Sequence, residues 1–201
     1  MPVGTTAAGE QPQASLPIAA RSAFASAILS VVSIVTLALM LGVDRRYRLL
    51  DDIVVFLFTL TRFPLLPALH RVATSGLTSG FAFMVLGTLG LGLMGLLQAL
   101  ILAGVLTFER VSNVLDTAAA GFGVAIAAVS ILAWRRRSLP GGLSLLGVVL
   151  GVTLIIPTLS IWLGPDSPAG LGKLGTFLLY PIWAVRVGRL LSRSDAVAAP
   201  S

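Results

Sequence analysis

Long apolar runs, separated by short clusters of charge, are the feature of this sequence that most constrains its fold. Stretches of about 20 apolar residues recur along the chain, and each is long enough to cross the roughly 30 Å hydrocarbon core of a bilayer as an α-helix. Only 11% of the residues are charged and the mean hydropathy is +0.98, whereas soluble domains carry about 25% charged residues. The pattern predicts an all-α protein, a polytopic transmembrane helical bundle.

Six segments satisfy this length requirement, and we expect them to form one bundle between two polar tails. The tails cover residues 1–20 and 193–201, and the bundle covers residues 21–192. The expected spans are residues 22–43, 49–69, 79–107, 115–134, 142–163 and 171–191. The first apolar run, Ala23 to Val43, is longer than the ~7–15 residues of a secretory h-region and ends in LMLGVDRRYR instead of a small-residue cleavage site. We therefore expect a retained anchor.

The second segment contains an arginine within its apolar run. Residues 53–69 read IVVFLFTLTRFPLLPAL, with Arg62 in the middle and prolines at positions 64 and 67. An arginine at mid-membrane costs about 2.5–3.5 kcal/mol on insertion scales, while each leucine, isoleucine, phenylalanine or valine recovers up to about half a kcal/mol. The free energy of inserting this segment is therefore near zero. An alternative with five spans is open, in which residues 49–69 are re-entrant or interfacial.

The distribution of basic residues predicts the orientation, because cytoplasmic loops are enriched in lysine and arginine. Six spans with a cytoplasmic N-terminus place eight arginines inside and five basic residues outside, whereas five spans change the balance to eleven and three. Charge alone favours five spans. Both schemes put the C-terminus on the cytoplasmic side of the inner (plasma) membrane. The expected topology anchors are Arg135, Arg136, Arg137, Arg186 and Arg189.

Small residues at helical spacing predict close contacts between spans. The sets are Ser22, Ser26, Ser30 and Ser33 in the first span, Ala119, Gly123 and Ala127 in the fourth, and Gly147 and Gly151 in the fifth. We expect these faces to pack inside one bundle, and the alternative is a face for a homo-oligomer or a membrane-protein partner. Indole rings prefer the headgroup layer, so we also expect three tryptophans near span ends to lie there. These are Trp134, Trp162 and Trp183.

Three stretches have sequence patterns that resemble those of a known class of proteins. The arginine-rich AWRRRSLPGGLSLLGVVLGV leads through a proline into a glycine-rich span, and the chain ends its last span on LLYPIWAVRVGRLLSR. The motif RFPLLPALHRV runs from a proline-containing helix into a basic loop. Over roughly residues 49–71 and 130–193 the chain resembles small bacterial multi-pass membrane proteins of domain-of-unknown-function families. The resemblance implies six helices with both termini inside and brings no activity; the basic loop at 45–48 departs from it.

Little in the sequence points to chemistry. Cysteine is absent and histidine occurs once, so thiolate metal sites and cysteine nucleophiles are excluded and a histidine metal site has little scope. The chain has no HExxH, GxSxG or P-loop motif, and we expect no cofactor, no metal and no catalytic residue. The net charge of +6 sits beside membrane spans, which favours anionic lipid headgroups as partners over nucleic acid.

Four polar residues are weak functional candidates. His70 is either a proton-relay group or an interfacial residue, and Asp116 is either a functional acid or a group at a helix start or rim. We expect Arg62 to snorkel or to pair with an acid other than Asp116, and Gln98 to hydrogen-bond a neighbouring helix. Asp51 and Asp52 are interpreted as part of a solvated loop.

Two functions remain open from the sequence. The first is a non-enzymatic accessory or structural subunit of a membrane assembly, for which the small-residue helix faces and apolar interior argue. The alternative is a small transporter or channel that uses Arg62, Asp116 and Gln98 within the bundle. An intramembrane enzyme ranks third.

Overall fold

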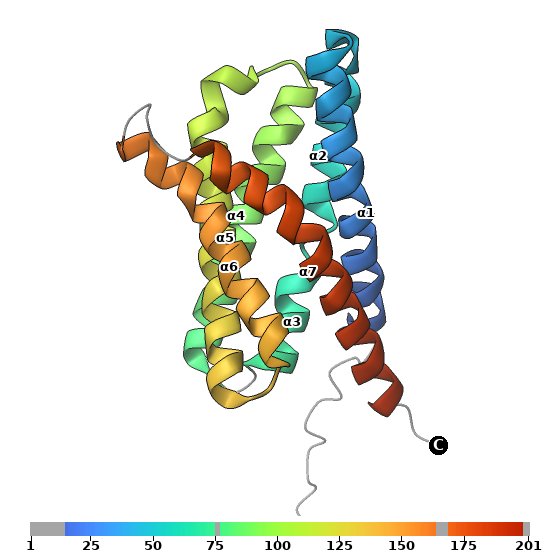
Figure 1. The fold of residues 1–201 in the computed structure, drawn as a ribbon, viewed down its shortest axis with the longest axis vertical. Helices are drawn as coiled ribbons and strands as arrows, with labels where there is room; N and C mark the ends of the chain where they lie inside the picture. Colours follow the sequence, from blue (N-terminus) through green and yellow to red (C-terminus); the bar gives the residue numbers. More distant parts are fainter. Residues whose placement is uncertain (1–14, 75–76, 164–168, 199–201) are drawn as a thin grey trace, which may run out of the picture.

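The computed structural model describes residues 15–74, 77–163 and 169–198, and these ranges are almost entirely helical (Figure 1). A short 3-10 turn, η1 (Arg45–Tyr47), joins the first two helices. The helices are α1 (Ser15–Gly42), α2 (Arg48–Leu60), α3 (Leu65–Ala73), α4 (Thr78–Leu102), α5 (Phe108–Arg136), α6 (Gly141–Leu163) and α7 (Ala169–Ala198). No strand occurs in the described ranges, so the prediction of an all-α bundle is confirmed.

These helices make six spans, because α2 and α3 together form one. Within the described ranges, six helical stretches are long and apolar enough to cross a membrane, and the second runs from Arg48 to Ala73. The start of α1 and the end of α7 lie at the same end of the bundle (Figure 1). The six-span prediction is therefore confirmed, and the five-span alternative is wrong because residues 49–69 continue from one end of the bundle towards the other.

The bundle is organised around α5, which packs against α4 on one side and α6 on the other. Helix α7 crosses the bundle obliquely and contacts both α6 and α1 (Figure 1). Helix α2 lies between α1 and α4, while the short α3 contacts α1, α4 and α5. This arrangement brings α2, α5 and α7 around the middle of the bundle, where the arginine of the second span is buried.

The second span is broken at its centre. Helix α2 ends at Leu60, and the turn to α3 is closed by short-range bonds, from Arg62 N to the Thr59 carbonyl (3.1 Å) and from Leu65 N to the Arg62 carbonyl (3.0 Å). Pro64 and Pro67 have no N–H to donate, so they interrupt the regular helical ladder. The break therefore places Arg62 on a turn between two half-helices.

Small residues bring α5 and α6 into backbone contact. A Cβ built on Gly151 would lie 2.5 Å from the carbonyl oxygen of Gly123 and 2.7 Å from the Cβ of Ala127, and a Cβ on Gly147 would overlap the hydroxyl of Ser130. The GxxxG of α6 and the small-residue face of α5 thus pack against each other inside the bundle, as expected. A homo-oligomer through further small-residue faces stays a prediction.

The hydroxyl stripe of α1 is also buried inside the bundle, with Ser26, Ser30 and Ser33 each no more than 3% exposed.

One tryptophan departs from its expected place. Trp134 and Trp162 are exposed, but Trp183 is only 2% exposed and stacks beside Tyr180 with 5.8 Å between ring centroids. Trp183 lies near the middle of the apolar stretch Gly170–Arg193 of α7, on the face that the oblique course of α7 turns towards the core.

Candidate functional site

Arg62 lies inside the bundle against three aromatic rings. Its guanidinium carbon is 3.5 Å from the ring centroid of Phe58, 4.5 Å from that of Tyr180 and 5.4 Å from that of Phe122. We call these three rings the aromatic cage. They come from α2, α7 and α5, and the Phe58 and Tyr180 rings meet edge to face at 5.0 Å.

The aromatic cage replaces the carboxylate that a buried arginine usually requires. Arg62 is 3% exposed, its Nε has no hydrogen-bond partner, and none of the ion pairs among the described residues includes it. A weakly hydrated, planar guanidinium stacks on aromatic faces, and such contacts reach about 2 kcal/mol when desolvated. The expectation that Arg62 snorkels or pairs with an acid is therefore wrong: the broken helix turns it inward, onto rings from distant segments.

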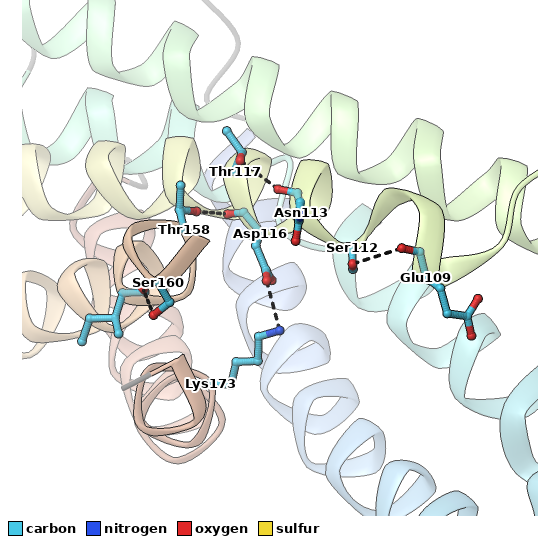
Figure 2. Close-up of polar contacts among 9 residues, drawn as sticks. Glu109, Ser112, Asn113, Asp116, Thr117, Thr158, Ser160 and Lys173 are labelled. Atoms are coloured by element: carbon cyan, nitrogen blue, oxygen red, sulfur yellow. Dashed lines mark hydrogen bonds and ion pairs between the residues drawn. The ribbon is translucent and has the colours of Figure 1, made fainter. Parts of the chain in front are cut away.

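Asp116 takes part in a contact that ties three helices together (Figure 2). Its carboxylate lies 3.0 Å from the Nζ of Lys173 on α7, and its backbone carbonyl accepts a hydrogen bond from the Thr158 hydroxyl of α6 at 2.7 Å. A half-exposed ion pair of this kind contributes up to about 1 kcal/mol. The helix-start role is wrong because α5 already begins at Phe108, about two turns before Asp116. A place at the rim of the membrane stays a prediction.

Gln98 is buried one turn before the end of α4, with 7% exposure, and its Oε1 has no hydrogen-bond partner. We expected Gln98 to hydrogen-bond a neighbouring helix, but within the described residues no N–H or O–H group donates to this oxygen. An unsatisfied buried acceptor costs about 1–3 kcal/mol. Such an atom needs an explanation, and its surroundings supply one.

Gln98 lines a pocket of about 380 Å³ at the end of the bundle opposite the start of α1 and the end of α7, which we call the acidic pocket. Its wall is formed by α1, α2, α4 and α5. The polar residues of the lining are Arg48, Asp51, Asp52, Gln98 and Glu109. The remaining seven of the twelve lining residues are apolar, so the pocket combines charged side chains with a mainly apolar lining.

The two aspartates of α2 are not in a solvated loop, as the sequence had suggested. Both lie in the first turns of α2 and are half-buried, and Asp51 accepts a 2.6 Å hydrogen bond from the Thr36 hydroxyl. Arg48 approaches Glu109 at 3.7 Å, and both of these side chains are largely exposed at the mouth of the pocket. Asp51 and Asp52 thus lie half-buried at the pocket wall, and neither belongs to an ion pair formed by the side chains that the structure describes.

His70 is half-buried near the end of α3. Its Nδ1 lies 2.8 Å from the Thr74 hydroxyl, and its ring meets that of Phe81 edge to face at 6.2 Å. Within the described ranges it takes part in no ion pair with a carboxylate. The contacts fit a residue that helps to close α3, and the proton-relay role stays a prediction.

The expected topology anchors lie on α5 and α7, towards the end of the bundle at which α1 starts and α5 and α7 end, which we call the basic end (Figure 1). Arg135, Arg136 and Arg137 are exposed at the end of α5, where Arg137 adopts a left-handed conformation (φ 55°) that terminates the helix. Arg186 and Arg189 are exposed on α7, and the Nη1 of Arg186 reaches the start of α6 beside Gly142. With Arg21, Arg71 and Arg193, eight arginines lie at this end.

The structure does not bring the four candidate residues together. Arg62 is in the aromatic cage, Asp116 is paired with Lys173, Gln98 lines the acidic pocket and His70 lies near the end of α3. Sequence reasoning missed Phe122 and Tyr180, because no local pattern links them to Arg62. It also missed Glu109, although its place beside a predicted loop gave a weak signal.

Comparison of the chain with protein-family profiles, curated proteins and solved structures gave no match. The resemblance to families of bacterial multi-pass proteins stays a prediction.

Proposed function

We propose that the chain is a non-enzymatic accessory or structural subunit of the bacterial plasma membrane, with its basic end in the cytoplasm. The observation that supports this most is the segregation of charge between the two ends. Eight arginines share the basic end with one acid of the described helices, Asp195, whereas the opposite end holds five basic and five acidic residues. Arginine-rich segments stay on the cytoplasmic side during insertion.

The interior of the bundle supports a structural role over transport. Arg62 is enclosed by the aromatic cage, and the hydroxyls of Ser26 and Ser33 lie on buried helix faces. Of the three groups on which a transport path depends, only Gln98 lines the acidic pocket. These polar groups lie at separate helix contacts and do not share one cavity. Such an arrangement is typical of membrane bundles, in which small and polar residues hold helices together.

The basic end fits a partner with dense negative charge, and anionic lipid headgroups lie at the correct level. Each arginine near an anionic leaflet contributes about 1 kcal/mol of binding free energy. Arg186 and Arg189 are exposed on the final helix, where they face the headgroup layer in the proposed orientation.

Thermal unfolding in nanodiscs tests this contact. We expect the melting temperature to be higher in phosphatidylglycerol than in phosphatidylcholine, and the double variant R186Q/R189Q to lose part of this difference. The matched control, R46Q/R110Q, removes two exposed arginines from the opposite end and should keep the wild-type difference. Equal lipid dependence in all three proteins would reject the proposed role of the basic end. Electrogenic flux in proteoliposomes that Gln98→Leu abolishes would instead support the transporter alternative.

A further inference from the structure

The acidic pocket combines features that point to a ligand. Its lining contains three carboxylates and one arginine, Arg48, which lies 3.7 Å from the exposed Glu109. Asp51 and Asp52 lie at the wall and form no ion pair within 4 Å with the cationic side chains that the structure describes, a set that does not include Arg45. Beyond that distance, the charge of Arg48 also attracts Asp52. Adjacent carboxylates in a poorly hydrated site repel each other, and a cation between them relieves the repulsion.

The second observation is the amide of Gln98. This side chain is 93% buried (7% exposed), lines the same pocket from α4, and carries an Oε1 without a donor. Burial places it on the inner wall, whereas Arg48 and Glu109 are exposed at the mouth. An amide oxygen of this kind accepts a hydrogen bond from an N–H group, which a quaternary ammonium does not offer.

The apolar part of the lining limits the ligand further. Leu37 and Met40 of α1, Val55 of α2 and Phe108 of α5 form walls beside the carboxylates. No three His, Cys, Asp or Glu side chains of the described residues are placed to share a metal ion. A volume of about 380 Å³ lies within the roughly 300–1,000 Å³ of small-molecule sites.

We propose that the acidic pocket binds an organic ammonium group that carries N–H donors and an apolar substituent. The ammonium lies between the carboxylates of Asp51 and Asp52 and donates to the Oε1 of Gln98, while the apolar part packs against the α1 and α5 walls. Such a group occurs in soluble primary amines and in the ethanolamine headgroup of lipids. The proposal concerns the end opposite the basic end and is independent of the proposed headgroup contacts there.

Binding is measured on the full chain in detergent with phenethylamine as the probe, by its effect on the melting temperature and by calorimetry. Three control compounds have a similar apolar body. Phenylethanol lacks the positive charge, phenylacetate carries a negative charge, and N,N,N-trimethylphenethylammonium keeps the positive charge but lacks N–H donors. We expect phenethylamine alone of the four to stabilise the protein, in a concentration-dependent manner. A parallel measurement in nanodiscs distinguishes a lipid headgroup from a soluble amine as the natural ligand. If the pocket binds the ethanolamine headgroup, phenethylamine should bind more weakly in phosphatidylethanolamine nanodiscs than in phosphatidylcholine nanodiscs. If the pocket binds only soluble amines, phenethylamine should bind equally in both.

Three variants locate the site. Asp52→Asn and Gln98→Leu should each weaken phenethylamine binding, the former by about tenfold or more because it removes a charged acceptor. Asp44→Asn is the matched control, since Asp44 lies at the same end but outside the pocket and pairs with the exposed Arg46. Gln98→Leu leaves all charges in place, so it separates hydrogen bonding from general electrostatic attraction. Equal binding in every variant, or equal stabilisation by phenylethanol, would overturn the proposal.

Discussion

At the level of single residues, Arg62 shows how a membrane bundle holds a cation without a counter-ion. Its guanidinium is delocalised and planar, so the aromatic cage of Phe58, Phe122 and Tyr180 covers it with ring faces. Tyr180 is itself anchored, because its hydroxyl donates to the Ser26 Oγ at 3.1 Å. The stack therefore ties α2 to α7 and α1 at the centre of the molecule.

Substitution of Arg62 tests whether stacking or charge matters. Lysine keeps the charge but concentrates it on a strongly hydrated ammonium, so Arg62→Lys should lower the free energy of unfolding by about 2–3 kcal/mol. Methionine keeps an unbranched apolar stem and removes the buried charge, so Arg62→Met should stay within about 1 kcal/mol of wild type. The free energies are measured by SDS titration in mixed micelles. A lysine variant as stable as the wild type would show that the cage is not what accommodates the charge.

At the level of helices, the contact between α5 and α6 depends on the absence of side chains at their crossing. Backbone approaches this close let many weak van der Waals contacts form, which is the main attraction between helices in lipid. Not every glycine of the bundle lies at such a contact. Gly92 of α4 has no atom within 4 Å of the position that a Cβ would take.

These two kinds of glycine predict opposite effects of one added methyl group. Gly151→Ala should lower the free energy of unfolding by about 1–3 kcal/mol, since the new Cβ would lie 2.5 Å from the Gly123 carbonyl oxygen. Gly92→Ala should leave stability unchanged or raise it by about 0.5–1 kcal/mol, because alanine is the better helix former. The same SDS titration applied to both variants checks the pair, and equal effects would argue against a close α5–α6 crossing in the membrane.

At the level of the whole molecule, an even number of spans places both termini on one side, and the arginines decide which side. We expect single cysteines in place of Ser15 and Ser194 to resist a membrane-impermeant maleimide in intact cells and to react after permeabilisation. A cysteine in place of the exposed Arg46 should react in intact cells. The native chain contains no cysteine, so each signal comes from one site. Labelling at position 15 but not at 194 in intact cells would contradict the six-span arrangement.

The arginine triplet should control this orientation. In the Ser194→Cys background, changing Arg135, Arg136 and Arg137 to glutamine should make part of the protein reactive in intact cells or lower its insertion yield. Neutralising Arg45, Arg46 and Arg110 instead removes basic residues from the opposite end, so it should leave position 194 protected. An unchanged pattern in the triplet variant would remove these residues from the set of topology anchors.

The sequence by itself determined the helical class and the approximate limits of the apolar segments, because about 20 apolar residues crossing a bilayer must satisfy their own backbone hydrogen bonds as a helix. It also located the arginines that gather at the basic end, and the small residues Gly123 and Gly151 that meet between α5 and α6. These features depend on composition and on the period of the helix, which are local properties.

Only the tertiary structure decided what surrounds the polar groups. The five-span alternative stayed open because the cost of Arg62 is judged on an isolated helix in lipid. Rings 60 and 118 residues away along the chain remove this side chain from lipid. In the same way, Asp51 and Gln98 belong to one pocket only because α2 and α4 pack side by side. Hydropathy along a chain fixes which segments enter the membrane, but the contacts that neutralise or expose a charge form between segments, and packing alone selects them.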